Sequence, residues 1–545
     1  MKVFISILGI IALICCPLHS DAKKTDKKTV VPQMLNYPSA SIGEYRMHGG
    51  DVLMRVNVSF PEALDSVPQD VRKPLLKRFS EKLNTNPPTA FLRNYLLNRE
   101  TVHSLIFNDD CTIEKKFDIP YPMFVFVRPL GLIYMSPGDT VDISINVKVK
   151  TKSRDEAFVV DGTGLSGEVN RLMKEIDRKY LNQENYASCL IDRADQIDSL
   201  LIWKNRQVAR LDSIVMKMND GLPEIANCSP LASDIVRTRI LTWYAMILFD
   251  SFNDHLREDY DRDAHWRKYY DFIAPREKYL LDNPLLLISV DDSYFNRIEF
   301  GLLSPLQPRV LQSYPNRYDK EKDILYGDSL YTMRRSLPDG MKKIHDSLHI
   351  NPSNITSQVC LMRNVFYIME KGFFDDDFES YADRLADIMP YIKNPDLARL
   401  STFAYRDFVK KHETLAPEVV PTSKADSVFQ RIIEPYKGNL LVVDFWSMSC
   451  GPCRAGMIQD RDKVQAMKDK PVKFLYITYD SPENCKTWLD ENNIKGEHIF
   501  ITNAEWSMMQ EKFNFSGIPF HVIVDKSGKL LHNANNYEDL LKSLE

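Results

Sequence analysis

The chain has 545 residues, with 70 basic and 75 acidic side chains and a formal net charge of −5. At roughly 150 residues per domain, this length predicts three or more domains, and the composition is that of a folded globular protein. The near balance of charge provides no basic surface for a nucleic acid or an anionic membrane, so it argues against nucleic-acid binding.

The N-terminus has the pattern of a secretory signal peptide, which we assign to residues 1–22. Lys2 precedes an apolar run at residues 3–14 that is too short to span a bilayer, and Ser20 and Ala22 provide the small residues that a signal peptidase reads. We therefore expect export to the periplasm or cell envelope, followed by cleavage of this segment.

Two cysteines in that segment leave a lipoprotein alternative open. Acylation of Cys16 would anchor the mature protein to a membrane, although Cys15 stands before it where a small residue is wanted. The polar, basic residues 23–40 are expected to form a disordered leader. Five further cysteines are too scattered for a disulfide scaffold and are interpreted as buried small side chains: Cys111, Cys189, Cys228, Cys360 and Cys485.

Residues 41–163 are predicted to form a β-rich, sandwich-like domain. Apolar and polar side chains alternate strictly along residues 141–149, which is the period of a strand with one buried face. We expect further strands at 123–127 and 156–160, and a helix at 71–83. No group of side chains in this region resembles a catalytic site, so the domain is interpreted as a packing or docking module.

Residues 164–413 are predicted to form a helical domain, because apolar and charged faces alternate at helical spacing and glycine is sparse. His345 and His349 lie one helical turn apart, but no third ligand accompanies them, so a solvated helix face is favoured over a metal site. Prolines in residues 414–422 block helix formation and indicate an extended linker. The clearest helical stretches are 168–181, 192–218, 231–252, 329–348 and 376–388.

Residues 423–545 form the predicted C-terminal domain and carry the most specific motif. A near-continuous apolar run at 440–446 predicts a parallel strand that is covered on both faces. Cys450 and Cys453 follow this strand as a C-x-x-C pair, and Pro452 between them suits the first turn of a helix, where its missing N–H is tolerated.

The position of the pair at a helix N-terminus has chemical consequences. The unpaired N–H groups there favour an anion and lower the pKa of a thiol from about 8.5, so Cys450 is the predicted attacking thiolate. Cys453 would resolve the mixed disulfide and needs a base to take its proton. Asp444, six residues before Cys450 in an otherwise apolar strand, is the candidate base. The alternative for Asp444 is a strand-end residue that backbone amides satisfy.

Half of a zinc site or a structural disulfide would also explain two cysteines at this spacing. Zinc needs four ligands, usually from a second C-x-x-C or a spaced histidine pair, and neither follows downstream. A redox pair is therefore predicted, with no metal and with no cofactor beyond the dithiol itself.

The cysteine pair with its strand, and a Gly-Ile-Pro loop with the strand after it, resemble the thioredoxin fold. The residues that carry this resemblance are 443–446, 450–454, 517–519 and 522–529. The resemblance implies that Pro519 is cis, lies beside the cysteine pair, and exposes the backbone of Ile518 for pairing with a substrate chain. It also assigns three residues to the substrate-binding surface: Trp446, Gly451 and Pro452.

An insertion narrows the resemblance further. A helix at 482–493, a strand at 498–501 and a helix at 505–513 resemble the TlpA/ResA-like branch, the extracytoplasmic thiol:disulfide oxidoreductases of bacteria. We therefore expect an α/β thioredoxin fold with a TlpA-type βα insertion. Residues 108–111, 121–122, 137–140 and 162–163 resemble an N-terminal β-domain that often precedes TlpA-like domains in multidomain Bacteroidetes envelope proteins.

Three positions qualify this resemblance. Ser449 stands where the family usually has Trp, and Ile458 stands near the place of an expected helix proline. The surface beside the thiolate should therefore differ, and the helix should be straighter. Ile518 before the proline, in place of the Thr often seen in disulfide-forming relatives, favours a reductase.

The resemblance implies an exported thiol:disulfide oxidoreductase that reduces protein disulfides. Its implied partners are oxidised envelope proteins, including apocytochrome c, and a membrane protein that donates electrons. A second hypothesis is an envelope binding or adaptor protein whose dithiol senses redox state, because about three quarters of the chain shows no catalytic chemistry. A peroxidase is the weakest option, because Met448 and Ser449 do not supply the usual Thr-x-x-Cys setting.

Overall fold

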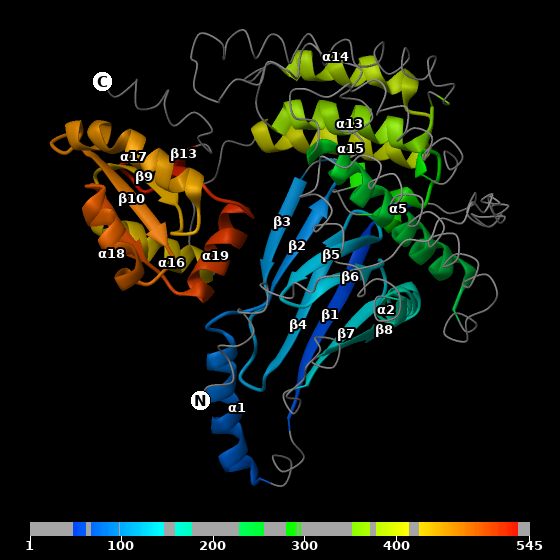
Figure 1. Cartoon of the computed structure of the whole chain (residues 1–545), viewed down its shortest axis with the longest axis horizontal. Helices are drawn as coiled ribbons and strands as arrows, with labels where there is room; N and C mark the ends of the chain where they lie inside the picture. The colour runs from blue at the N-terminus through cyan, green and yellow to red at the C-terminus, as the bar shows by residue number, and fades with distance from the viewer. Residues whose placement is uncertain are drawn as a thin grey trace, which may run out of the picture. The chain divides into compact units, whose positions relative to one another are not determined.

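The structure is a computed structural model, shown in Figure 1. All described residues belong to one compact unit, Asn36–Glu545. The predicted signal peptide, the leader, the linker at 414–422, Cys189 and the pair His345 and His349 lie outside the described residues. The structure describes residues 47–60, 67–97, 99–146, 158–176, 228–254, 280–290, 294–295, 351, 353–370, 378–413 and 424–531.

The described part of the N-terminal region is rich in β-structure. Its strands are β1 (Gly50–Ser59), β2 (Thr89–Asn94), β3 (Arg99–Ser104), β4 (Thr112–Ile119), β5 (Met123–Arg128), β6 (Gly131–Met135), β7 (Thr140–Asn146) and β8 (Phe158–Gly162). They form two four-stranded sheets, with strand orders β4-β1-β7-β8 and β3-β2-β5-β6. Apolar side chains of both sheets, such as Val52 and Val125, belong to one buried cluster.

Several of these elements were predicted from the sequence. β5, β7 and β8 coincide with the strands expected at 123–127, 141–149 and 156–160, and the described part of β7 ends at Asn146. Helix α1 (Gln69–Leu83) begins two residues before the predicted start. β1 pairs in parallel with β7 and antiparallel with β4, so its partners are distant in sequence and local pattern alone does not reveal them.

Helices make up the described middle of the chain, as predicted, whereas the helices expected at 192–218 and 329–348 lie outside the described residues. They are α2 (Gly164–Ile176), α5 (Pro230–Asp254), α8 (Leu286–Ser289), α13 (Ile355–Glu370), α14 (Phe378–Ile388), the 3₁₀ turn η7 (Met389–Tyr391) and α15 (Pro395–Glu413). Their apolar side chains, such as Val169 and Phe366, continue the buried cluster of the two sheets. Among the described helices, none is both long and apolar enough to cross a membrane.

The C-terminal region is an α/β structure around a five-stranded sheet. Its elements are α16 (Lys424–Ile433), η8 (Glu434–Tyr436), β9 (Leu440–Phe445), α17 (Gly451–Ala466), β10 (Val472–Thr478), α18 (Pro482–Glu491), β11 (Glu497–Phe500), α19 (Asn503–Phe513), β12 (Phe520–Val524) and β13 (Leu530–Leu531). The strand order is β11-β10-β9-β12-β13. β9, β10 and β11 are parallel, and β12 returns antiparallel to β9. The predicted helix, strand and helix of the insertion are α18, β11 and α19.

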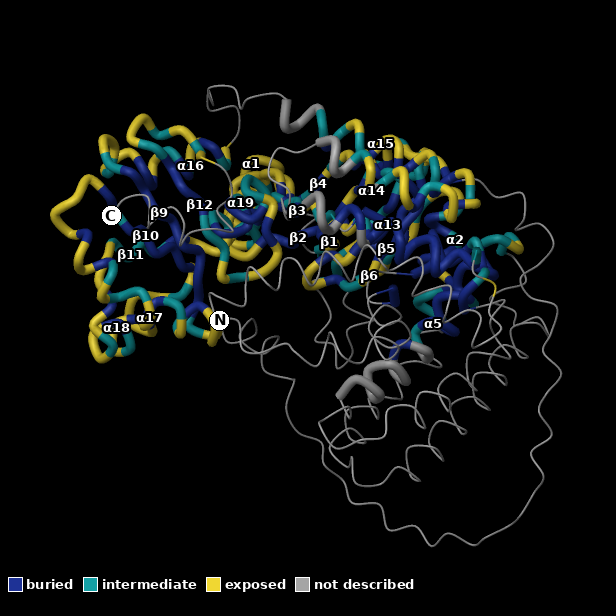
Figure 2. Tube along the Cα trace, turned by 90° about the horizontal axis from the view of Figure 1, so that it is seen from above, coloured by how far each residue is buried: buried dark blue, intermediate teal, exposed yellow. Residues whose placement is uncertain are grey.

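The central strand β9 is buried along its whole length (Figure 2). Its two faces belong to different buried clusters. Val442 and Trp446 pack with the cysteine pair and α17 on one face. Val443 and Phe445 pack on the other face with apolar residues of α16 and α19. Because strand side chains alternate between faces, Asp444 must project toward the face that carries α17 and the cysteines.

Helix α19 also contacts the edge strand β3 of the N-terminal sheets. The amide of Val102 donates a hydrogen bond to Asn514 Oδ1 at 3.1 Å, and the amide of Ser104 donates one to Glu511 Oε2 at 3.0 Å. An edge strand presents unpaired backbone groups that need partners. The side chains of Asn514 and Glu511 therefore accept the backbone hydrogen bonds that a neighbouring strand would otherwise accept.

The charge of Glu511 reinforces this contact. Lys115 Nζ lies 2.9 Å from Glu511 Oε1, and His103 Nδ1 lies 3.7 Å from the same oxygen. Burial acts to raise the pKa of Glu511, but hydrogen bonds from His103 and Lys115 and the charge of Lys115 lower it to about 2. The carboxylate therefore stays charged across the physiological range, and it ties the C-terminal domain to the sheet.

Truncation of Phe445 should destabilise the C-terminal domain. Phe445 is fully buried, and its ring lies 4.9 Å from that of Phe515 and 5.8 Å from that of Trp506. We expect Phe445→Ala to lower the free energy of unfolding by about 3–5 kcal/mol, through lost burial and a residual cavity. Urea denaturation of the full chain, with hydrogen exchange read on β9, measures this change.

Phe403→Ala is the matched control, because Phe403 is 65% exposed on α15. It should change stability by less than about 0.5 kcal/mol. Equal effects of the two substitutions would contradict the assignment of Phe445 to the core.

Candidate active site

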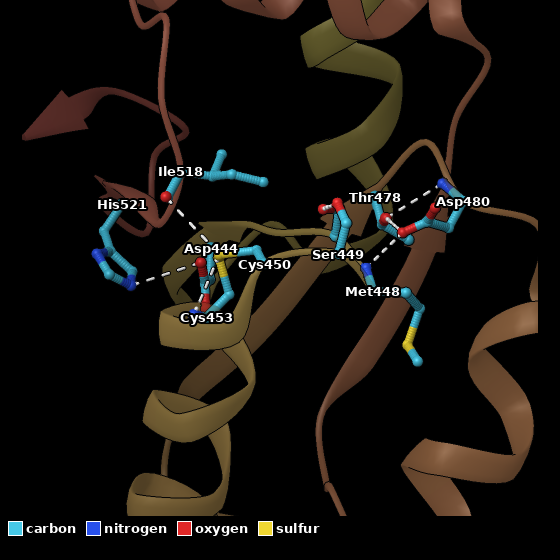
Figure 3. Close-up of a disulfide and its surroundings, with 10 residues drawn as sticks. Asp444, Met448, Ser449, Cys450, Cys453, Thr478, Asp480, Ile518 and His521 are labelled. Atoms are coloured by element: carbon cyan, nitrogen blue, oxygen red, sulfur yellow. Dashed lines mark hydrogen bonds and ion pairs between the residues drawn. A yellow bond between two sulfur atoms is a disulfide. The ribbon is translucent and has the colours of Figure 1, made fainter. Parts of the chain in front are cut away.

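Cys450 and Cys453 form a disulfide at the start of α17 (Figure 3). Cys450 is the N-cap residue of this helix, and the amide of Cys453 donates a hydrogen bond to Cys450 Sγ at 3.1 Å. Cys450 retains 9% exposure and Cys453 2%, so the first cysteine is the more accessible residue. This is the order of exposure that an attacking and a resolving cysteine require.

The helix N-terminus provides the electrostatics of the pair. The amide that donates to Cys450 Sγ is one of the first N–H groups of α17, which have no partner within the helix. Once the disulfide is reduced, the same amide and the helix dipole would stabilise a thiolate on Cys450. Gly451 and Pro452 between the cysteines are exposed, which leaves the surface beside Cys450 open to a partner.

The loop between β9 and Cys450 is held by hydrogen bonds. The amide of Met448 donates to Asp480 Oδ2 at 2.6 Å, and the amide of Cys450 donates to the carbonyl of Ser447 at 3.0 Å. The hydroxyls of Ser447 and Ser449 lie 2.9 Å apart. Ser449, which replaces the usual aromatic residue, thus contributes to a polar network in the loop.

The loop before β12 lies directly beside the reactive sulfur. The Ile518–Pro519 peptide bond is cis, as the resemblance implied, and Ile518 O lies 3.7 Å from Cys450 Sγ. A disulfide sulfur carries no hydrogen, so this contact becomes a hydrogen bond only when Cys450 is a thiol. Gly517 and Pro519 are exposed, so an extended chain could reach the backbone here.

Trp446 lies differently from the other residues assigned to the substrate surface. Its side chain has no exposed area, and its ring packs 5.8 Å from that of Trp488. The Trp446 side chain packs beneath the cysteine pair in the same buried cluster, so a partner protein could not contact it in this conformation.

Asp444 lies in the middle of a row of three side chains that crosses the sheet. In the strand register it pairs with Tyr476 on β10 and with His521 on β12. All three project toward the face that carries α17, because Phe474 and Ile523 belong to the same cluster as the cysteines.

Asp444 itself is buried, with 8% exposure. Its Oδ1 lies 3.5 Å from His521 Nε2, which is an ion-pair separation and longer than a good hydrogen bond. Within the described residues this oxygen has no hydrogen-bond partner, so backbone amides do not satisfy it. Figure 3 shows the His521 ring turned toward Asp444.

The surroundings raise the pKa values of the two side chains beside Asp444, His521 and Tyr476. Burial acts to lower the pKa of His521, but the adjacent carboxylate of Asp444, with a contribution from Asp460, raises it above its usual value. Burial, with the nearby negative charges of Asp444 and Asp460, raises the pKa of Tyr476 and keeps its phenol neutral.

The sequence analysis did not single out His521, Tyr476 or Asp480. His521 could have been found from the period of a strand, because it lies two residues after Pro519 in the segment that returns beside β9. Asp480 follows β10 by two residues, at the same sheet edge as the loop before Cys450. Its bond to Met448 links two loops that only the fold brings together.

Two further described cysteines, Cys111 and Cys485, are buried free thiols. Cys485 belongs to the same buried cluster as the Cys450–Cys453 pair. Burial, with nearby acidic side chains, raises the pKa of Cys111 and of Cys485 to about 11. In the part of the chain that the structure describes, no group of three or more potential ligands could hold a metal ion.

The AhpC/TSA family matches residues 421–540. No curated protein matches the chain significantly. One similar solved structure is the thioredoxin domain of a thiol-disulfide oxidoreductase from Bacteroides vulgatus, with 24% identity, a TM-score of 0.19, and coverage of 21% of this chain and 81% of that chain. Another is a thiol:disulfide interchange protein from Bacteroides sp., with 24% identity, a TM-score of 0.20 and coverage of 21% and 75%.

A third is a thioredoxin-family thiol:disulfide interchange protein from Chlorobium tepidum, with 18% identity, a TM-score of 0.19, and coverage of 20% of this chain and 83% of that chain. The family match covers the C-terminal region only. That region has a thioredoxin-like fold, and Cys450 and Cys453 are its C-x-x-C pair.

The environments of the cysteines predict their order of reactivity. In the reduced, folded protein at pH 7, a thiol with a pKa near 11 is ionised in only about one molecule in ten thousand, whereas a thiol at a helix N-terminus is ionised far more often. We expect iodoacetamide to label Cys450 at least about a hundred times faster than Cys485. Peptide mass spectrometry of timed samples measures both rates.

The same labelling in concentrated urea is the control, and there the two rates should converge. Equal labelling of Cys450 and Cys485 in the folded protein would show that the helix N-terminus does not activate Cys450.

Proposed function

We propose that this chain is an exported protein-disulfide reductase that works in the periplasm or cell envelope. The observation that carries the proposal is the position of Cys450. Cys450 caps α17 and retains 9% exposure, and its sulfur lies 3.7 Å from the carbonyl of Ile518, in the loop before β12 between the exposed residues Gly517 and Pro519. A partner chain that pairs with this loop would bring its own disulfide to the sulfur.

In the first step, the Cys450 thiolate attacks one sulfur of a partner disulfide. A bond forms between Cys450 Sγ and that sulfur, the partner's sulfur–sulfur bond breaks, and the second partner sulfur leaves as a thiolate that takes a proton from water. The amide of Cys453 donates to Cys450 Sγ and holds the charge of the attacking sulfur before the bond forms.

In the second step, Cys453 releases the partner. Its thiol proton passes to the Asp444 carboxylate, and the resulting thiolate attacks Cys450 Sγ. The Cys450–Cys453 disulfide seen in the structure forms, the bond between Cys450 Sγ and the first partner sulfur breaks, and that first sulfur leaves and is protonated. Two electrons have then moved from the protein dithiol to the partner disulfide.

Another turnover requires a donor of two electrons that reduces the Cys450–Cys453 disulfide. We propose that this donor is a membrane protein and that the substrates are oxidised envelope proteins, of which apocytochrome c is one candidate. The N-terminal sequence supports export, and acylation of Cys16 would place the domain near such a donor. The contact between α19 and β3 lets the N-terminal region influence which partner reaches the dithiol.

The proposal predicts a trapped intermediate. With dithiothreitol as electron donor, the full chain should reduce insulin disulfides. Cys453→Ser should instead accumulate a mixed disulfide through Cys450, because the resolving thiol is missing. Non-reducing electrophoresis followed by peptide mass spectrometry identifies the linked residue.

Cys450→Ser is the matched control, and it should form neither the mixed disulfide nor reduced insulin. A folded wild-type protein that leaves insulin oxidised, together with a Cys453→Ser variant that traps nothing, would refute the reductase and favour an adaptor.

A further inference from the structure

We propose that His521 is a positioning residue for disulfide exchange, which acts by keeping the Asp444 carboxylate ionised so that it can accept the proton of Cys453. The proposal rests on the reductase function proposed above and adds a residue to its second step. His521 would not touch the reacting sulfurs, and its effect would pass through Asp444.

The strand register places the two side chains together. His521 is the partner of Asp444 where β12 returns beside β9, and both project toward the face that α17 covers. The imidazole Nε2 lies 3.5 Å from Asp444 Oδ1, which is an oxygen without a hydrogen bond among the described residues. A buried carboxylate that few other groups stabilise is sensitive to the charge of one neighbour.

Among the described groups near this pair, His521 is the one that can balance the charge of Asp444. Tyr476 on β10 is neutral because its pKa is raised, so it cannot balance a negative charge. Asp460 on α17 adds a second negative charge, although Lys463 pairs with it at 2.9 Å. Both carboxylates favour a protonated His521.

The side chains differ in their access to solvent. The His521 side chain is 29% exposed and that of Asp444 only 11%, so the imidazole can exchange protons with water while the carboxylate stays covered. Below its raised pKa, His521 carries a positive charge and stabilises the anion of Asp444. The carboxylate that accepts the Cys453 proton then has a positive charge beside it.

The resolving step tests this role directly. The reduced full chain is mixed with excess oxidised glutathione between pH 4.5 and 8, and samples are quenched in acid. Intact mass spectrometry then follows the glutathionylated protein as it forms at Cys450 and as it decays through attack by Cys453. The rate of decay against pH reports the ionisation of the base.

We expect the acid limb of this decay to lie about one pH unit higher in His521→Leu than in the wild type, because Asp444 has lost its counter-charge. His521→Lys should restore the wild-type limb, since the lysine keeps a positive charge. Asp444→Asn should slow the decay by about a hundredfold. The double variant Asp444→Asn with His521→Leu should behave like Asp444→Asn alone.

His498→Gln is the matched control. It removes another partly buried histidine from the same sheet, one that stacks on Tyr476 and bonds to the carbonyl of Ile494. Its acid limb should match that of the wild type, and both His521 variants should keep the wild-type far-ultraviolet circular dichroism.

Two results would overturn the inference while leaving the reductase intact. One is an unchanged acid limb in His521→Leu. The other is an equal shift in His521→Leu and His521→Lys, which would show that packing of the imidazole matters and its charge does not. A wild-type protein that forms no mixed disulfide at Cys450 would instead refute the proposed function, and the inference with it.

Discussion

A carboxylate in the middle of a covered sheet is the constraint around which the C-terminal site is organised. Asp444 occupies the central strand β9, all of whose side chains are buried. An isolated charge in such a place is costly, so its neighbours must either balance it or leave it protonated. Here Asp444 lies between Tyr476 and His521 and on the same face as α17. In the proposed mechanism, this buried carboxylate accepts the proton of Cys453.

The reactive pair depends on two further features of the same sheet. The end of β9 places Cys450 at the N-terminus of α17, where the amide of Cys453 donates a hydrogen bond to its sulfur. The return of β12 sets the exposed Gly517–Pro519 loop against that sulfur from the other side. The two cysteines therefore have different environments. Cys450 contacts the N-terminus of α17 and the loop before β12, whereas Cys453 is buried in the apolar cluster on the same face of the sheet as Asp444.

Much of this arrangement could be predicted from sequence because it depends on local pattern. The apolar run of β9, the cysteine spacing and the elements of the insertion are all readable over short windows. His521 was missed because its importance comes from the antiparallel return of β12 beside β9. The contact between Ser104 and Glu511 joins residues 407 positions apart, and no periodicity reveals it. Trp446 was assigned to the surface by resemblance, whereas strand alternation places it in the core.

The reduction potential of the Cys450–Cys453 couple tests the central claim most directly, because stabilising the thiolate and controlling the proton both act on this quantity. It can be measured by equilibrating the full chain in dithiothreitol redox buffers and quantifying the free thiols of the pair by alkylation. If the protein is a reductase, this reduction potential should be about −270 mV, as in thioredoxin-like reductants. A value near about −120 mV, as in strong oxidants, would contradict the account and point to a protein that forms disulfides.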